Sequence, residues 1–112
     1  MKEIFYYLRD NSKKPVVTVC IVQEEDGAFY KGVSVCGKKD FPWKSMGRKI
    51  ALKRAIIAKT CHDGGGYQRF PDGHKIPVPG GLCAPNGEQP PHTMFPIEIA
   101  PELNEFEKSL FD

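Results

Sequence analysis

Three apolar segments in the first third of the chain have the pattern that is typical of β-strands. They are residues 3–8 (EIFYYL), 16–23 (VVTVCIVQ) and 28–36 (AFYKGVSVC), and short polar turns separate them. β-Branched and aromatic residues favour strands, and short connections favour antiparallel pairing of consecutive strands. The pattern therefore predicts an antiparallel meander at the start of the chain.

Alternation along these strands predicts two unlike sheet faces, because successive side chains point to opposite sides. One face carries Val17, Val19, Ile21, Phe29, Lys31, Val33 and Val35. The other face carries Thr18, Cys20, Tyr30, Gly32, Ser34 and Cys36. We expect the long helix of the chain to cover the first face, so that the second needs another cover or a partner. Gly32 inside a strand predicts a bulge or a point of close contact.

Residues 43–60 (WKSMGRKIALKRAIIAKT) have the periodicity of an amphipathic helix. The large apolar side chains on its predicted inner side are Trp43, Met46, Ile50 and Ile57. Beside them runs a stripe of small residues, Gly47, Ala51, Ala55 and Ala58, which predicts a close approach of the helix to the sheet. Pro42 suits a first helical turn, and Asp40 just before it is the expected cap.

The second half of the chain differs in kind, because residues 61–91 contain seven glycines and six prolines. We expect a long loop over 61–93, with Gly64–Gly66 ending the helix, and with parts of the loop packed down at its apolar residues Tyr67, Phe70, Ile76, Val78 and Leu82. Residues 94–99 predict an edge strand, and residues 101–111 predict a short acidic helix that begins at Pro101.

These elements together predict one α+β domain over residues 1–112. Its antiparallel three- or four-stranded sheet is packed by one main helix, and a long Gly/Pro-rich loop and a short C-terminal helix follow. Residues 1–60 form the meander and helix, 61–93 the loop, and 94–112 the edge strand and acidic helix. The length of 112 residues and the hydrophobic fraction of 40% suit one modest core. No apolar run is long enough to span a bilayer, so we expect a soluble, cytoplasmic protein.

Charge is unevenly distributed along the chain, although the net charge is only +2. Residues 1–60 hold 13 Lys and Arg against 6 Asp and Glu, whereas residues 61–112 hold 3 against 8. The basic residues of the predicted helix form either a solvated face or a binding surface for phosphates or an acidic protein. The candidate binding residues are Trp43, Lys44, Arg48, Lys49, Lys53, Arg54, Tyr67, Arg69 and Phe70.

The chemistry of metal sites and of thiol catalysis is only weakly indicated. The four cysteines include no CxxC pair, and we expect Cys20 and Cys36 to pack as small apolar residues within strands. The weak candidates for zinc ligands are Cys61, His62, His74, Cys83 and His92, whose spacing matches no standard zinc finger. We therefore expect no cofactor, and a zinc-dependent or thiol enzyme is the second alternative function.

The meander followed by a helix with the pattern Gly47-Arg48-Lys49-x-Ala51-x-x-Arg54-Ala55 resembles a type of small, uncharacterised phage and prophage protein. The resemblance covers residues 1–60 and does not extend into the Gly/Pro-rich segment. It implies a mobile-element context, in which small non-enzymatic proteins act on nucleic acid or on host proteins.

We therefore expect a non-catalytic accessory protein that binds a host or phage macromolecular complex, with inhibition as one form of this role. A protein partner is the first expectation, and the oligomeric state is open. Direct nucleic-acid binding is the alternative, because the basic helix can neutralise phosphates and the aromatic residues Tyr6, Tyr7, Tyr30 and Trp43, which we expect to be exposed, can stack on bases. The acidic second half of the chain opposes that alternative.

Overall fold

Four strands form the main sheet, in the order β1-β2-β3-β6, and all neighbouring strands are antiparallel. The computed structural model describes residues 2–35, 44–62, 76–77, 81–87, 93–94, 97–99 and 101–111. The strands of the main sheet are β1 (Lys2–Arg9), β2 (Pro15–Gln23), β3 (Phe29–Val35) and β6 (Ile97–Ile99). Two short strands, β4 (Ile76–Pro77) and β5 (Thr93–Met94), pair separately.

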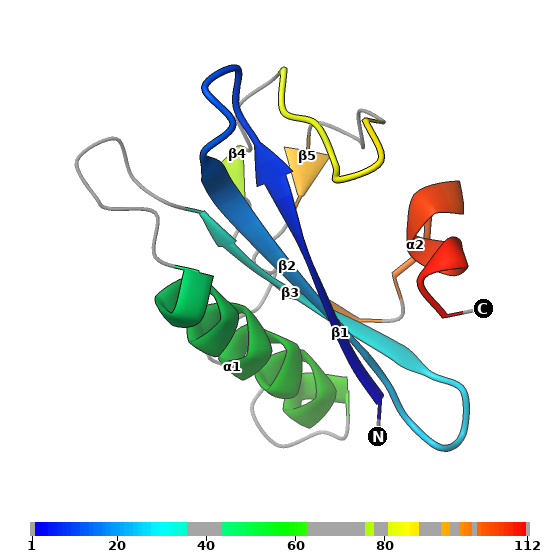
Figure 1. The fold of residues 1–112 in the computed structure, drawn as a ribbon. Helices are drawn as coiled ribbons and strands as arrows, with labels where there is room; N and C mark the ends of the chain where they lie inside the picture. Colours follow the sequence, from blue (N-terminus) through cyan, green and yellow to red (C-terminus); the bar gives the residue numbers. More distant parts are fainter. Residues whose placement is uncertain are drawn as a thin grey trace.

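Two helices lie on opposite faces of the sheet, α1 (Lys44–His62) and α2 (Glu105–Ser109) (Figure 1). The α+β class, the antiparallel meander, the main helix and the short C-terminal helix predicted from the sequence are thus confirmed. The meander turns form where polar residues were noted; in the first turn, Asp10 Oδ1 accepts hydrogen bonds from the N–H groups of Ser12 and Lys14.

Helix α1 covers the face that carries Thr18, Cys20 and Gly32, so the prediction that it covers the valine-rich face is wrong. The reason is how closely its backbone approaches the sheet. A Cβ atom added at Gly32 would collide with the main-chain oxygen of Ala51 and the main-chain nitrogen of Ala55. Only the face with small side chains admits a helix at this separation, and the bulky Val and Ile side chains of the other face do not.

The inner surface of α1 is its stripe of small residues, as predicted, because Gly47, Ala51, Ala55 and Ala58 are all buried. The prediction that Met46 faces the sheet is wrong, since 49% of it is exposed. Ile50 and Ile57 lie at the margin and are half-buried. Gly32 is a point of close contact and not a bulge, because it pairs with Cys20 in regular register.

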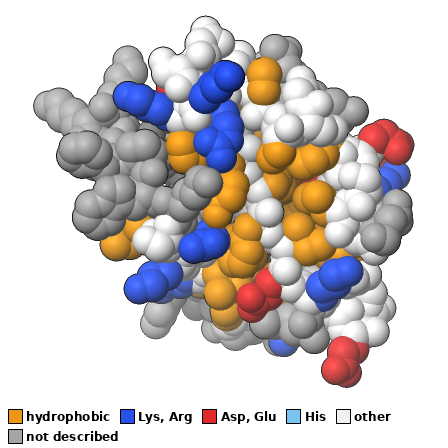
Figure 2. All heavy atoms as spheres, in the orientation of Figure 1, with side chains coloured by type: hydrophobic (Ala, Val, Ile, Leu, Met, Phe, Trp, Pro, Cys, Tyr) orange, Lys and Arg blue, Asp and Glu red, His pale blue; other side chains and the backbone are white. Residues whose placement is uncertain are grey.

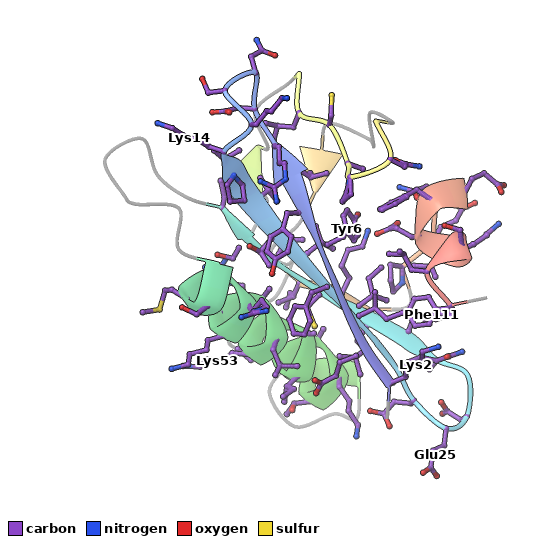
Figure 3. The ribbon with its side chains drawn as sticks, viewed as in Figure 1. Lys2, Tyr6, Lys14, Glu25, Lys53 and Phe111 are labelled. Atoms are coloured by element: carbon purple, nitrogen blue, oxygen red, sulfur yellow. The ribbon has the colours of Figure 1, made fainter. Side chains whose placement is uncertain are left out.

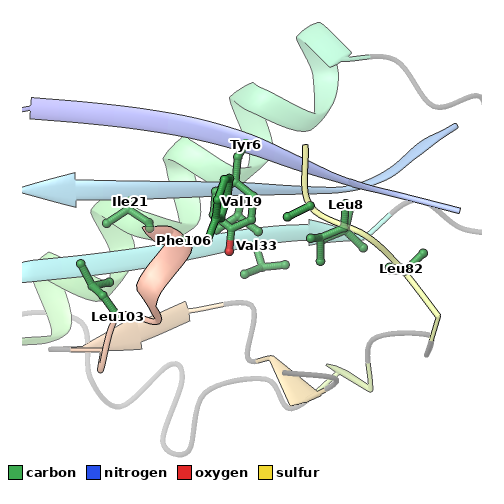
Figure 4. Close-up of a cluster of buried hydrophobic side chains, with 10 residues drawn as sticks. Tyr6, Leu8, Val19, Ile21, Val33, Leu82, Leu103 and Phe106 are labelled. Atoms are coloured by element: carbon green, nitrogen blue, oxygen red, sulfur yellow. The ribbon is translucent and has the colours of Figure 1, made fainter. Parts of the chain in front are cut away.

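The opposite face of the sheet carries the larger apolar cluster, which includes Val17, Val19, Ile21, Val33, Tyr6 and Leu8 (Figure 4). Two segments remote in sequence cover it. Leu103 and Phe106 come from the α2 region, and Leu82 and Ala84 come from residues 81–87. The expectation that Leu82 packs down is confirmed. The residues predicted to pack down at Tyr67, Phe70 and Val78, and the helix end predicted at Gly64–Gly66, lie outside the described residues. So do Cys36, Asp40 and Pro42.

Helix α2 begins at Glu105, four residues after the start that was predicted at Pro101. Asn104 is the N-cap, its side chain accepts a hydrogen bond from the N–H of Glu107, and the Glu107 side chain accepts one from the N–H of Asn104. This reciprocal capping box fixes the start of the helix more strongly than Pro101 does. Of the predicted edge strand over 94–99, residues Ile97–Ile99 pair with β3, whereas Met94 belongs to β5.

Candidate functional site

The outward side of α1 presents basic and apolar side chains together. Lys49 and Lys53 are exposed, and so are the large apolar side chains of Met46 and Ile56, at 49% and 43% respectively. At 3.6 residues per turn, these four positions fall within an arc of about 80°. We call these four residues, with the exposed Arg48 beside them, the outer face of α1. In Figure 3 the Lys53 side chain points away from the sheet.

The outer face exists because the small residues of α1 face inward. When Gly47, Ala51, Ala55 and Ala58 form the contact with the sheet, the larger residues on the opposite side of the helix have no core to enter. Among the described residues, no carboxylate forms an ion pair with Arg48, Lys49 or Lys53. Their charge is therefore directed to solvent or to a ligand.

Two further basic residues of α1 have structural roles. Lys59 Nζ lies 3.0 Å from Glu24 Oε1, which ties the end of α1 to the β2–β3 turn. Arg54 is half-buried, and its Nη1 donates a 2.6 Å hydrogen bond to the carbonyl oxygen of Val33. Desolvation by burial lowers the pKa of Arg54. The guanidinium thus contacts a main-chain carbonyl of β3, where the sequence predicted water or a carboxylate, and the role of Arg54 in binding stays a prediction.

Two of the four aromatic residues that were predicted to be exposed for stacking are buried. Tyr6 and Tyr30 are 2% and 3% exposed and belong to the two sides of the core, and Tyr7 is half-buried. The remaining aromatic and basic candidates, Trp43, Tyr67, Arg69 and Phe70, lie outside the described residues, and only the backbone of Lys44 is described. Of the nine candidate binding residues, the structure places Arg48, Lys49 and Lys53 together on one exposed surface.

The candidates for zinc and thiol chemistry are not brought together in the described part of the chain. Cys61 and His62 form the last positions of α1, where the backbone alone is described, and His74 and His92 lie outside the described residues. Within those residues, no three His, Cys, Asp or Glu side chains form a group that could hold a metal ion. Cys83 is half-buried and pairs through its main chain with Arg9.

Cys20 is a free thiol that is buried between β2 and α1, as the apolar packing prediction required. Burial, with a smaller contribution from the charge of Glu3, raises its pKa to about 12. A thiol with this pKa has almost no thiolate near neutral pH and is therefore a poor nucleophile. Cys20 fills space in the core.

Sequence reasoning missed a buried ionic cluster on the valine-rich face. Lys31 and Glu107 are 5% and 1% exposed, and Lys31 Nζ lies 2.9 Å from Glu107 Oε2. The hydroxyl of Tyr6 donates a 2.8 Å hydrogen bond to the same carboxylate oxygen. A signal was present, because Lys31 alternates with Phe29 and Val33, and Glu107 lies four residues after Leu103 on the apolar side of α2. Both Glu107 oxygens have partners within the protein, so the cluster holds α2 on the sheet.

Within the described ranges, no helix combines the length and the apolar character needed to cross a membrane. No protein family model, no curated protein and no solved structure matches this chain.

Proposed function

We propose that this chain is a non-catalytic binding protein and that the outer face of α1 docks on an acidic surface of a partner protein. The observation that supports the proposal is the exposure of Met46 and Ile56 beside Lys49 and Lys53. Apolar anchors between basic residues suit a partner groove that is apolar at its centre and acidic at its rim. Binding that blocks this partner surface is the simplest route to inhibition of the complex to which it belongs.

The spacing of the two anchors suits a helix that lies along a groove. Ten residues separate Met46 from Ile56, which corresponds to about 15 Å along the helix axis. Each side chain is already about half covered, so full burial would contribute about 1 kcal/mol. The lysines contribute mainly to the rate of association, because rim charges steer the encounter and are screened by salt.

The phage context implied by the resemblance of residues 1–60 supports a host or phage complex as the source of the partner. Two buried groups that could act in catalysis are engaged within the fold. Cys20 is buried with a raised pKa, and the carboxylate of Glu107 is occupied by internal contacts.

Affinity purification of the tagged chain from its native host tests the proposal. We expect the partner to be retained by wild-type protein and lost when Lys49 and Lys53 are both replaced by Glu, or when Met46 and Ile56 are both replaced by Ser. The matched control reverses two lysines of the β1–β2 turn, Lys13→Glu with Lys14→Glu, and should retain the partner. Equal retention by all variants, or equal loss from the control, would overturn the proposal.

Direct nucleic-acid binding is the second candidate, which is supported by the three exposed basic residues Arg48, Lys49 and Lys53 within about two turns of α1. It is less favoured because Tyr6 and Tyr30, two of the aromatic residues expected to stack on bases, are buried. Titration with single- and double-stranded DNA and RNA near physiological salt distinguishes the candidates. Tight binding that the triple Ala variant of the basic residues abolishes would replace the protein-docking proposal.

A further inference from the structure

Within the described part of the chain, most of the outer edge of β1 has no strand paired to it. β1 ends the sheet order, and among the described residues only Cys83 pairs with its outer edge. This pairing lies at the far end of the strand, where the N–H of Arg9 donates to Cys83 and the N–H of Cys83 donates to Arg9. β1 faces the viewer in Figure 2, and hydrophobic side chains gather on either side of it.

The Arg9 hydrogen bonds also establish which main-chain groups of β1 point outward. Along a strand, the N–H and C=O groups of alternate residues point to alternate sides. Because Arg9 points outward, the groups of Phe5 and Glu3 also point outward, whereas those of Ile4 and Tyr6 point toward β2. The irregularity near Arg9 does not alter this alternation, because the extra residue, Val16, lies in β2.

The side chains along this edge lack the usual protection against pairing. Open edges in monomeric proteins are commonly guarded by proline, by bulges or by charges at the centre of the strand. Here the charges of Lys2 and Glu3 lie at one end, and the next residues, Ile4 and Phe5, are apolar and half-buried. Phe5 packs against the buried cluster between the sheet and α1, which includes Cys20 and Ala51, so the edge is ordered before any partner arrives.

We propose that the open edge of β1 pairs antiparallel with β1 of a second copy of this chain, around a two-fold axis between the two Ile4 residues. Glu3 of each copy then lies opposite Phe5 of the other, and each such pair exchanges main-chain hydrogen bonds in both directions. The two Ile4 side chains meet at the axis, and no charged residue faces a like charge. This register also keeps each strand clear of Cys83 and Ala84 of the other copy.

The resulting dimer has one continuous sheet with both α1 helices on the same side. Each copy retains an outer face of α1, so the dimer presents two docking surfaces and gains from bivalent contact with a partner complex. This inference stands independently of the proposed function, because it rests on the edge of β1 and its test requires no partner protein.

Sedimentation equilibrium of the full chain tests the dimer. We expect a mass that rises with concentration from 12.6 kDa toward twice that value. Glu3→Pro removes an outward N–H and blocks close approach of a second strand, without removing a bond to β2. We expect it to remain monomeric, whereas the matched control Glu3→Ala keeps the main chain intact and should still dimerise.

Hydrogen exchange followed by NMR gives a second measurement that requires no variant. In a monomer the amides of Ile4 and Tyr6 are protected and those of Glu3 and Phe5 exchange rapidly, whereas in the proposed dimer all four are protected. A monomeric mass at every concentration would overturn the proposal, and that is also the result expected if the edge accepts only a strand from another protein. A dimer that Glu3→Pro leaves intact, with a rapidly exchanging Phe5 amide, would also overturn it.

Discussion

Replacing Gly32 with alanine should remove the close contact between α1 and β3. The added Cβ would meet the main-chain oxygen of Ala51 and the main-chain nitrogen of Ala55, and its third neighbour, the carbonyl carbon of Arg54, would be 2.9 Å away. Main-chain atoms inside a helix cannot rotate aside as a side chain can, so α1 must shift as a body. Such overpacking costs about 3 kcal/mol or more, against a gain of up to about 1 kcal/mol from replacing a glycine.

The expected net loss of about 2 kcal/mol or more corresponds to a fall in Tm of about 8 °C or more for a domain of this size. Gly47→Ala is the matched control in the same interface. Its Cβ would meet the side-chain oxygen of Thr18 at 2.5 Å, which rotation of that side chain can relieve. Alanine also gains about 1 kcal/mol over glycine within a helix, so we expect the net change to stay within about 1 kcal/mol.

Thermal unfolding followed by circular dichroism, with chemical denaturation for the free energy, measures both variants. If Gly32→Ala melts within about 2 °C of wild type, a change worth less than about 0.5 kcal/mol, α1 does not approach β3 as closely as described. A large loss of stability in Gly47→Ala together with a small one in Gly32→Ala would mean that α1 approaches the sheet most closely at Gly47, and not where Gly32 meets Ala51 and Ala55.

Three further predictions concern buried polar groups. Glu107→Gln should cost about 3 kcal/mol in chemical denaturation, because it removes the charge that the buried Lys31 ammonium contacts, and adding Lys31→Met should recover much of this loss. Arg54→Met should cost about 2 kcal/mol, because it removes a charged hydrogen bond to the carbonyl of Val33. Cys20, with its pKa raised to about 12, favours the protonated folded state, so its contribution to stability is full below pH 9.0 and is lost as the pH rises toward about 12. A thiol reagent should label Cys20 only after unfolding.

Different results would contradict each of these. A double variant that loses the sum of its two single losses would mean that Lys31 and Glu107 do not interact. A neutral Arg54→Met would mean that the guanidinium does not satisfy the Val33 carbonyl. Rapid labelling of Cys20 in the native protein would mean that the thiol is accessible.

The sequence predicted the local elements well, because each has a local cause. Alternation defined the strands of the meander, and the stripe from Gly47 to Ala58 correctly predicted close packing of the main helix. It did not predict which face of the sheet the helix would cover. That choice depends on how the backbone of Gly32 fits against Ala51 and Ala55, and apolar periodicity does not describe this fit.

The candidate site was predicted in part. Charge located Arg48, Lys49 and Lys53, but Arg54 has the same charge and lies toward the sheet, where a main-chain carbonyl accepts its hydrogen bond. The exposure of Met46 could not be predicted, because large apolar residues are ordinarily assigned to the inner face. The pairing of Lys31 with Glu107 joins residues 76 positions apart, and it depends on where α2 docks.

Site-specific photocrosslinking in the cells in which the protein naturally occurs tests the central claim, that the outer face of α1 docks on a protein. A benzophenone amino acid replaces Met46 or Ile56 in turn, and Glu25, exposed in the β2–β3 turn, is the control position. We predict that both α1 positions form an adduct with the same protein, that the Glu25 position does not, and that reversing the charges of Lys49 and Lys53 removes the adducts. Adducts mainly with nucleic acid, or protein adducts no stronger at α1 than at Glu25, would contradict the account.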